Sequence, residues 1–354
     1  MMVEHYIFLL LSSLTLLQSN SRELKLIVEL FKKFFLLGAF LFISFRSFNT
    51  GNDTRAYLEL FQSIPFFNSL SDYLSSNRYE PGFMAWNYFF YNNLTENFTL
   101  YLLAVNGFYF SVSIYFYNKY AKNSAWVFLW FIFGVYYAMF TTMRACLALA
   151  FIYLVIDSLF KNKKLRFIIF SILAILFHSS SALIITLFLM VNKKTYSFFK
   201  YKTLLLVIAG IGAYFLNIIA SVFPYYSHYL DSSYVGIRMA SIFNFIILFG
   251  LYWISYINEI NKDLFLIKVN CFFYCQVLMS FASIQFNLLD RFTLFLYPFV
   301  IIYLCVIFPR LKLDRKVLIM LLIGILIVYQ VLTFIYRPNW KSIYPYHFVD
   351  WLDI

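Results

Sequence analysis

The feature that most constrains this chain is a series of apolar runs that match the length of a membrane-crossing helix. Crossing a bilayer takes about 20 consecutive apolar residues, and such runs recur along the 354 residues. Hydrophobic residues make up 63% of the chain and charged residues only 12%, whereas a soluble domain keeps about a quarter of its residues charged. The runs do not alternate apolar and polar residues as the strands of a membrane barrel do. The sequence therefore predicts an all-α polytopic membrane protein of about 10–12 transmembrane helices, forming a single transmembrane domain over residues 1–354. The predicted spans are 3–17, 28–46, 98–118, 124–141, 144–160, 167–191, 203–222, 240–257, 264–287, 291–308 and 317–336.

The linkers between these spans carry clustered Lys and Arg, and basic linkers face the cytoplasm. On this topology both termini lie outside, and residues 47–97 form a large extracytoplasmic loop with an amphipathic or re-entrant segment. Residues 223–239 form a second extracytoplasmic loop. The span 167–191 has basic clusters at both ends, so we expect a pair of short helices or a re-entrant hairpin, with its tip at 177–181. One long helix, which would place several lysines outside, is the alternative.

The first apolar run and the four cysteines predict neither a cleaved signal peptide nor disulfide bonds. Residues 1–6 carry Glu4 but no Lys or Arg, and no small-residue cleavage site follows Leu17, so we expect the first apolar run to be a helix that stays in the protein. The four cysteines lie inside apolar runs, without His or Cys at metal spacing. They are predicted to be packed, reduced thiols, and no metal site is expected.

The basic residues on the predicted outer side are mostly arginine. The inner lysines are explained by topology, but positive charge outside opposes the insertion signal. The planar guanidinium binds phosphate or carboxylate in a bidentate manner, so the outer arginines favour an anionic ligand that enters from the outer leaflet. The alternative is that each arginine pairs with an outer acid such as Asp53, Glu59, Glu80 or Asp290. The outer basic residues are Arg46, Arg55, Arg78, Arg144, Arg238, Arg291, Arg337 and Lys341.

Five short motifs then appear in order along the chain, and together they resemble the EpsG/Wzy family of polysaccharide polymerases. Each is weak alone, but their order and spacing run from about residue 34 to 310. Ala145 replaces a Gln that is common after the Met-Arg pair of the family. The elements are Arg46-Ser-Phe-Asn-Thr-Gly51-Asn-Asp53-Thr-Arg55-Ala-Tyr57, Arg78-Tyr79-Glu80-Pro81-Gly82-Phe83, Thr142-Met143-Arg144-Ala145-Cys146-Leu147-Ala148, Phe177-His178-Ser179-Ser180 and Asp290-Arg291-Phe292.

The resemblance implies a membrane glycosyltransferase of GT-C-like architecture in the bacterial cytoplasmic membrane, with its active face extracytoplasmic. It would polymerise oligosaccharide repeat units linked to undecaprenyl pyrophosphate, by transferring the growing glycan to the incoming lipid-linked unit. Both donor and acceptor are then partners, together with the lipid bilayer and a possible chain-length regulator protein. No cofactor and no nucleic acid are implied. Consistently, the sequence contains neither a Gly-rich phosphate loop nor a D-x-D pair.

Within this frame the arginines are expected to bind substrate and stabilise the pyrophosphate leaving group. Arg144, at the start of a helix, and Arg291, oriented by Asp290, are the first candidates for the pyrophosphate. Arg46 and Arg55 are the second candidates for binding the pyrophosphate. The predicted substrate-binding set also includes Arg78, Arg238 and Tyr57, the last with simple packing as its alternative.

Three residues are candidates for the base or orienting acceptor that the acceptor hydroxyl needs: Asp53, Glu80 and His178. The sequence does not rank them. His178 could instead cap a broken helix, and Asp53 could instead pair with Arg55.

Three other functions compete with the polymerase. An O-antigen ligase-like transferase would share the lipid-pyrophosphate chemistry but use another acceptor. A polysaccharide transporter or flippase would be expected to show an internal repeat, and an O-acyltransferase would use His178 with a second polar partner. The sugars, their linkage and its stereochemistry do not follow from the sequence.

Overall fold

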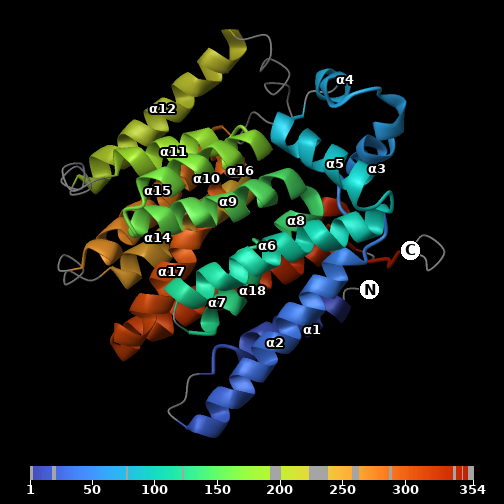
Figure 1. The fold of residues 1–354 in the computed structure, drawn as a ribbon. Helices are drawn as coiled ribbons and strands as arrows, with labels where there is room; N and C mark the ends of the chain where they lie inside the picture. Colours follow the sequence, from blue (N-terminus) through green and yellow to red (C-terminus); the bar gives the residue numbers. More distant parts are fainter. Residues whose placement is uncertain are drawn as a thin grey trace. The chain divides into compact units, whose positions relative to one another are not determined.

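The computed structural model describes residues 3–17, 21–76, 79–121, 123–191, 201–222, 238–256, 263–286, 289–337, 340–344 and 346–349. Every regular element in these ranges is a helix (Figure 1), and an isolated bridge joins Arg46 to Phe348. The chain forms two compact units, which are described separately: Met1–Ala182 with Ile327–Ile354, and Leu183–Leu326.

The first unit is built around α9, Met143–Phe160, which is buried along most of its length. Alanines at 145, 148 and 150 allow neighbouring backbones to approach closely, and α9 packs against α6 and α10. The remaining helices of this unit are α1 (Val3–Leu14), α2 (Arg22–Ser44), α3 (Thr54–Gln62), η1 (Ile64–Phe66), α4 (Leu70–Ser75), α5 (Pro81–Asn93), α6 (Phe98–Tyr120), α7 (Ala125–Ile132), α8 (Ala138–Thr141) and α10 (Lys164–Phe177), with η6 (Trp340–Ser342) near the carboxyl end.

The second unit centres on α15, Leu264–Ala282, which packs against four other helices: α12, α14, α16 and α17. Helix α18 passes from the second unit to the first, since the division falls within it. The bounds are α11 (Ser181–Met190), α12 (Lys202–Val222), α14 (Met239–Ser255), α16 (Asp290–Thr293), α17 (Tyr297–Ile307), η5 (Phe308–Arg310) and α18 (Leu313–Tyr336).

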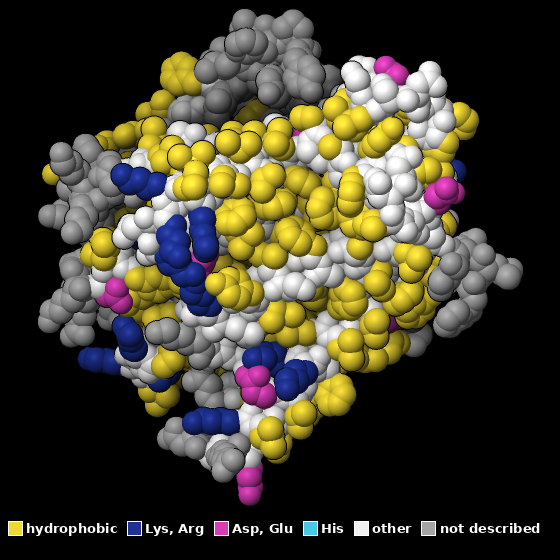
Figure 2. All heavy atoms as spheres, viewed as in Figure 1, with side chains coloured by type: hydrophobic (Ala, Val, Ile, Leu, Met, Phe, Trp, Pro, Cys, Tyr) yellow, Lys and Arg dark blue, Asp and Glu magenta, His cyan; other side chains and the backbone are white. Residues whose placement is uncertain are grey.

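The predicted class, an all-α polytopic membrane protein, is confirmed. Four described helices are long and apolar enough to cross a membrane: α6, α9, α15 and α18. Figure 2 shows hydrophobic side chains over much of the visible surface, which water would disfavour and lipid would not. The four cysteines are buried and free, as predicted.

Two predicted spans are each divided in the structure. The run 124–141 was expected to be one helix, but it forms α7 and α8, because the chain turns at Gly134 with φ of +72°. Continuous apolar composition hides such a turn. The run 167–191 forms two short helices, α10 and α11, separated by residues 178–180. The prediction of a pair with its break near the Phe-His-Ser motif is confirmed.

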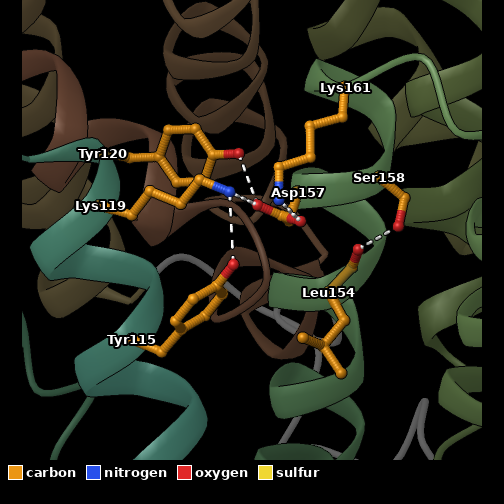
Figure 3. A network of polar contacts seen from close by, with 7 residues as sticks. All are labelled: Tyr115, Lys119, Tyr120, Leu154, Asp157, Ser158 and Lys161. Carbon is orange, nitrogen blue, oxygen red and sulfur yellow. Dashed lines mark hydrogen bonds and ion pairs between the residues drawn. The ribbon is translucent and has the colours of Figure 1, made fainter.

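A polar network joins α6 to α9 near their carboxyl ends, which the predicted topology places in the cytoplasm (Figure 3). Asp157 accepts a hydrogen bond from Tyr120 at 2.7 Å and forms ion pairs with Lys119 and with Lys161, the latter at 2.8 Å. Arg144 lies at the opposite end of α9, 13 residues away, or about 20 Å at 1.5 Å per residue. The network thus fixes one end of the helix whose other end carries a motif arginine.

Helix α5 approaches the end of α10 closely enough to require glycine at position 82. A Cβ there would lie 2.7 Å from both the Cβ and the carbonyl oxygen of Leu176. Leu176 immediately precedes the Phe-His-Ser motif, so this contact sets the distance between two of the motifs.

Gly82→Ala is therefore expected to destabilise the protein by about 1–3 kcal/mol, because the backbone of α10 has to move. Thermal unfolding of the purified protein in detergent measures the loss. Gly324→Ala is the matched control, since a Cβ at that helical position meets nothing within 4 Å, and alanine stabilises a helix by up to about 1 kcal/mol. Equal melting temperatures for the two variants would contradict the close approach.

Candidate functional site

The site forms around the carboxylate of Glu80. This residue occupies the N-cap position of α5, and Pro81 follows as the first helical residue. An N-cap carboxylate usually accepts from the backbone of its own helix, but Glu80 makes no such bond. Its side chain instead reaches the carboxyl end of α10 and the amino end of α9, so three helices meet at one carboxylate.

Glu80 Oε2 pairs with Arg144 Nη1. Its other oxygen, Oε1, lies 3.1 Å from His178 Nδ1 and accepts the backbone N–H of Ser179, also at 3.1 Å. The Ser179 hydroxyl lies 3.3 Å from the same oxygen. His178 and Ser179 belong to the break between α10 and α11, and His178 holds the C-cap position of α10. The break therefore supplies donors that a continuous helix would have consumed internally.

These donors keep Glu80 ionised. Burial of the carboxylate is the largest single influence on its pKa, and it opposes the charged form. The hydrogen bond with His178 and the charge of Arg144 outweigh it and lower the pKa of Glu80 to about 2. The carboxylate is thus a fixed negative charge at physiological pH, and it can accept a hydrogen bond from His178 Nδ1 when that nitrogen carries a proton.

Arg144 lies between this carboxylate and two tyrosines. Its guanidinium lies 4.5 Å from the ring centre of Tyr79, a cation–π contact, and its charge acts on Tyr57. Tyr57 is 3% exposed and packs edge-on against Phe83 at 5.4 Å, and burial raises the pKa of its hydroxyl. Arg144 Nε is buried without a hydrogen-bond partner among the residues that the structure describes.

The loop after α2 brings Arg46 to the same region. Arg46 is 1% exposed, and it donates to the carbonyl of Ile43 at 2.7 Å and to the Thr54 hydroxyl at 3.2 Å. Gly51 has φ of +90°, and a Cβ there would lie 1.8 Å from the carbonyl oxygen of Phe140. The loop therefore lies directly against the segment that leads into α9. Within the described part of the chain, Arg46 Nη2 is buried and lacks an acceptor.

The other predicted residues are placed differently. Arg55 forms an ion pair with Glu59 at 3.2 Å, with side chains 73% and 66% exposed, so its acid partner is Glu59 and the pair is solvated. Asp53 occupies the N-cap position of α3, and its charge acts on Tyr57. Arg78 lies outside the described residues, as does the loop 223–239 up to residue 237.

Three predicted residues belong to the second unit. Asp290 and Arg291 lie in α16, and Arg238 holds the N-cap position of α14. Burial raises the pKa of Asp290, against the hydrogen bonds from Ser283 and Ser241 and the charge of Arg238. A binding site shared by Arg144 and Arg291 stays a prediction. The structure brings together, within the first unit, Arg46, Tyr57, Glu80, Arg144 and His178.

Sequence reasoning missed three contributors to the site. Tyr79 and Ser179 each stand next to a predicted residue, and their place inside two motifs was the available signal. The third contributor is the segment 340–349, which pairs with the loop after α2. That contact joins residues about three hundred positions apart, and local sequence carries no signal for it.

Comparison with known proteins gives one match. Neither a curated protein nor a solved structure matches the chain. A family model described as the EpsG family matches residues 29–348, which include all the motifs around Glu80. The chain therefore belongs to the EpsG family, a family of Wzy-type polysaccharide polymerases.

Proposed function

We propose that this protein polymerises oligosaccharide repeat units linked to undecaprenyl pyrophosphate, on the outer face of the bacterial cytoplasmic membrane. The observation that carries the proposal is the pairing of Glu80 with both Arg144 and His178. One fixed carboxylate thereby orients a cation and a base, which are the two groups that glycosyl transfer from a diphosphate needs. Family membership supports the polymerase activity. The carrier lipid, the face of the membrane and the residue roles are our inference.

Arg144 would stabilise the leaving group. As the bond between the anomeric carbon and the diphosphate oxygen breaks, its electron pair stays on that oxygen, and negative charge accumulates there. A preorganised cation in a partly dry site lowers the energy of this charge by several kcal/mol. Arg144 stands at the amino end of an 18-residue helix, where the helix dipole acts on the same anion.

His178 would activate the acceptor. Since Nδ1 faces Glu80, Nε2 takes the proton of the acceptor sugar hydroxyl while the hydroxyl oxygen bonds to the anomeric carbon. The imidazolium that forms is stabilised by the Glu80 carboxylate, and the proton then passes to water. Glu80 itself keeps its charge throughout, which is the role of an orienting carboxylate.

The surroundings suit a substrate carried by lipid. Helix α10, which ends beside His178, exposes a run of apolar side chains to its surroundings: Leu165, Ile168, Ile169, Ile172, Ile175 and Leu176. A polyprenyl tail would lie along such a surface with its diphosphate at the helix end. A lipid-linked oligosaccharide donor and acceptor, and a chain-length regulator protein, are the partners that this function requires or allows.

Arg144→Ala is expected to lower polymer formation by about 10²–10³-fold, the effect of removing one preorganised donor. Arg144→Lys should recover little, because the planar fork is lost. The assay is incubation of the purified protein with a lipid-linked repeat unit and gel analysis of product length. A ladder of lengths on the carrier lipid indicates a polymerase, whereas addition of one block to another acceptor indicates a ligase.

Asp157→Asn is the matched control, since it breaks an ion-paired carboxylate at the opposite end of α9. It should reduce stability and leave the length distribution of the product unchanged. Full activity in both Arg144 variants would remove the arginine from the mechanism.

The pH profile separates Glu80 from His178. Because the pKa of Glu80 is lowered to about 2, its ionised form stabilises the fold above its ordinary pKa of 4.5, and that contribution is lost as the pH falls from 4.5 to 2. A general base acts only in its unprotonated form, so kcat/KM measured between pH 5 and 8 should fall on the acid side of that window. His178→Ala should abolish this limb and most of the activity. Wild-type turnover by His178→Ala across the window would exclude His178 as the base.

A further inference from the structure

Residues 340–344 and 346–349, which we call the carboxyl-terminal strap, are held along the loop that carries Arg46. Val349 N–H donates to the Phe45 carbonyl at 2.9 Å, and Ser47 N–H donates to the His347 carbonyl at 2.8 Å. Tyr346 stacks on Phe42 with ring centres 3.6 Å apart. The strap is therefore fixed to the end of α2 by both backbone and ring contacts.

The other end of the strap reaches the start of α9. Gly51 N–H donates to the Ser342 carbonyl at 2.7 Å, and Gly51 in turn lies against Phe140, two residues before the N-cap of α9. Ile343 and Tyr344 are 0% and 3% exposed. This continuous set of contacts places residue 341 beside the amino end of the helix that begins Met143-Arg144.

Lys341 is held there in a strained conformation. Its φ is +61° and that of Ser342 is +51°, a left-handed conformation that is unfavourable for a residue with a Cβ. Two such residues in succession persist only where their surroundings fix them, and this type of strain is concentrated at ligand-binding sites. The charges of Lys341 and Arg46 both act on the Cys146 thiol, in the first turn of α9. Two cations from distant parts of the sequence thus converge on that turn.

We infer that Lys341 is a further substrate-binding residue, which contributes an ammonium group to the diphosphate of the lipid-linked donor beside Arg46 and Arg144. The inference rests on the proposed function. Glu80 neutralises Arg144 in part, and Arg46 presents a buried Nη2 without an acceptor among the described residues. A diphosphate would provide acceptors for these cations at the positive end of the α9 dipole. The strap brings Lys341, the third cation, to Arg46 and Arg144.

The decisive variant is Lys341→Gly. It removes the ammonium group and also relieves the left-handed strain, since glycine adopts positive φ without cost. A role of Lys341 in backbone conformation alone predicts that this variant is as good as the wild type or better. Our inference predicts an unchanged or higher melting temperature with KM for the lipid-linked repeat unit raised about 10–100-fold. Lys341→Arg should stay within about threefold of the wild type, because the cation remains.

Inorganic pyrophosphate tests the binding step without turnover. Isothermal titration should show weaker pyrophosphate binding for Lys341→Gly than for the wild type, by a similar factor. Tyr344→Phe is the control within the strap: it removes the hydroxyl 3.3 Å from that of Tyr137 but leaves the cation, so both KM and pyrophosphate binding should be unchanged. Wild-type KM and pyrophosphate affinity in Lys341→Gly would overturn the inference, as would a loss that Lys341→Arg does not recover.

The alkaline limb of the pH profile gives an independent readout. Burial lowers the pKa of Lys341 to about 8, against the electrostatic influence of Cys146. The charges of Glu4 and Arg46 act on Tyr346 of the same strap. In the wild type, kcat/KM should therefore fall above pH 8 as the ammonium deprotonates, and Lys341→Arg should abolish that fall. A chain that makes no polymer at all would refute the proposed function, while the titration with pyrophosphate would still decide the role of Lys341.

Discussion

The structure of the first unit depends on a carboxylate that is largely withdrawn from water. Burying an unpaired carboxylate is costly, and the cost disappears only if donors surround it. Glu80 obtains them from the starts and ends of helices, where backbone and side-chain donors are not used within a helix. To satisfy Glu80, α5, α9 and the break after α10 must meet at one point. Gly82 and Gly51 allow that meeting by removing the side chains that would keep the backbones apart.

The same carboxylate gives the region its chemical character. It holds the imidazole of His178 in one orientation and, at the same time, holds the guanidinium of Arg144 against Tyr79. A group with its pKa near 2 cannot exchange protons with these partners at neutral pH, so it acts through orientation and charge. At the far end of α9 another acid, Asp157, binds two lysines and a tyrosine. The two ends of one buried helix are therefore each fixed by an ion-paired carboxylate.

Much of this arrangement could be predicted from the sequence, because membrane helices and their breaks leave local signals. The apolar runs predicted the all-α class, and charge on both sides of 167–191 predicted the break that presents His178. Which arginine meets which acid could not be predicted, since Glu80 contacts partners 64 and 98 residues away, and helix packing decides such pairs. The turn at Gly134 was hidden for another reason: both of its sides are apolar, so composition does not change across it. The partner of Arg55 could not be predicted either, because several acids lie near it in the sequence. The i, i+4 spacing on α3 favours Glu59, with which Arg55 pairs.

The strap imposes an order on the assembly of this protein. Tyr346 meets Phe42 across 304 residues of chain, so the loop with Arg46 and Gly51 leaves the ribosome long before its partner strand exists. Contacts between residues 340–349 and that loop can therefore form only after the helices from α3 to α18 have been synthesised, and until then the backbones of Phe45, Ser47 and Gly51 lack their partners in the strap.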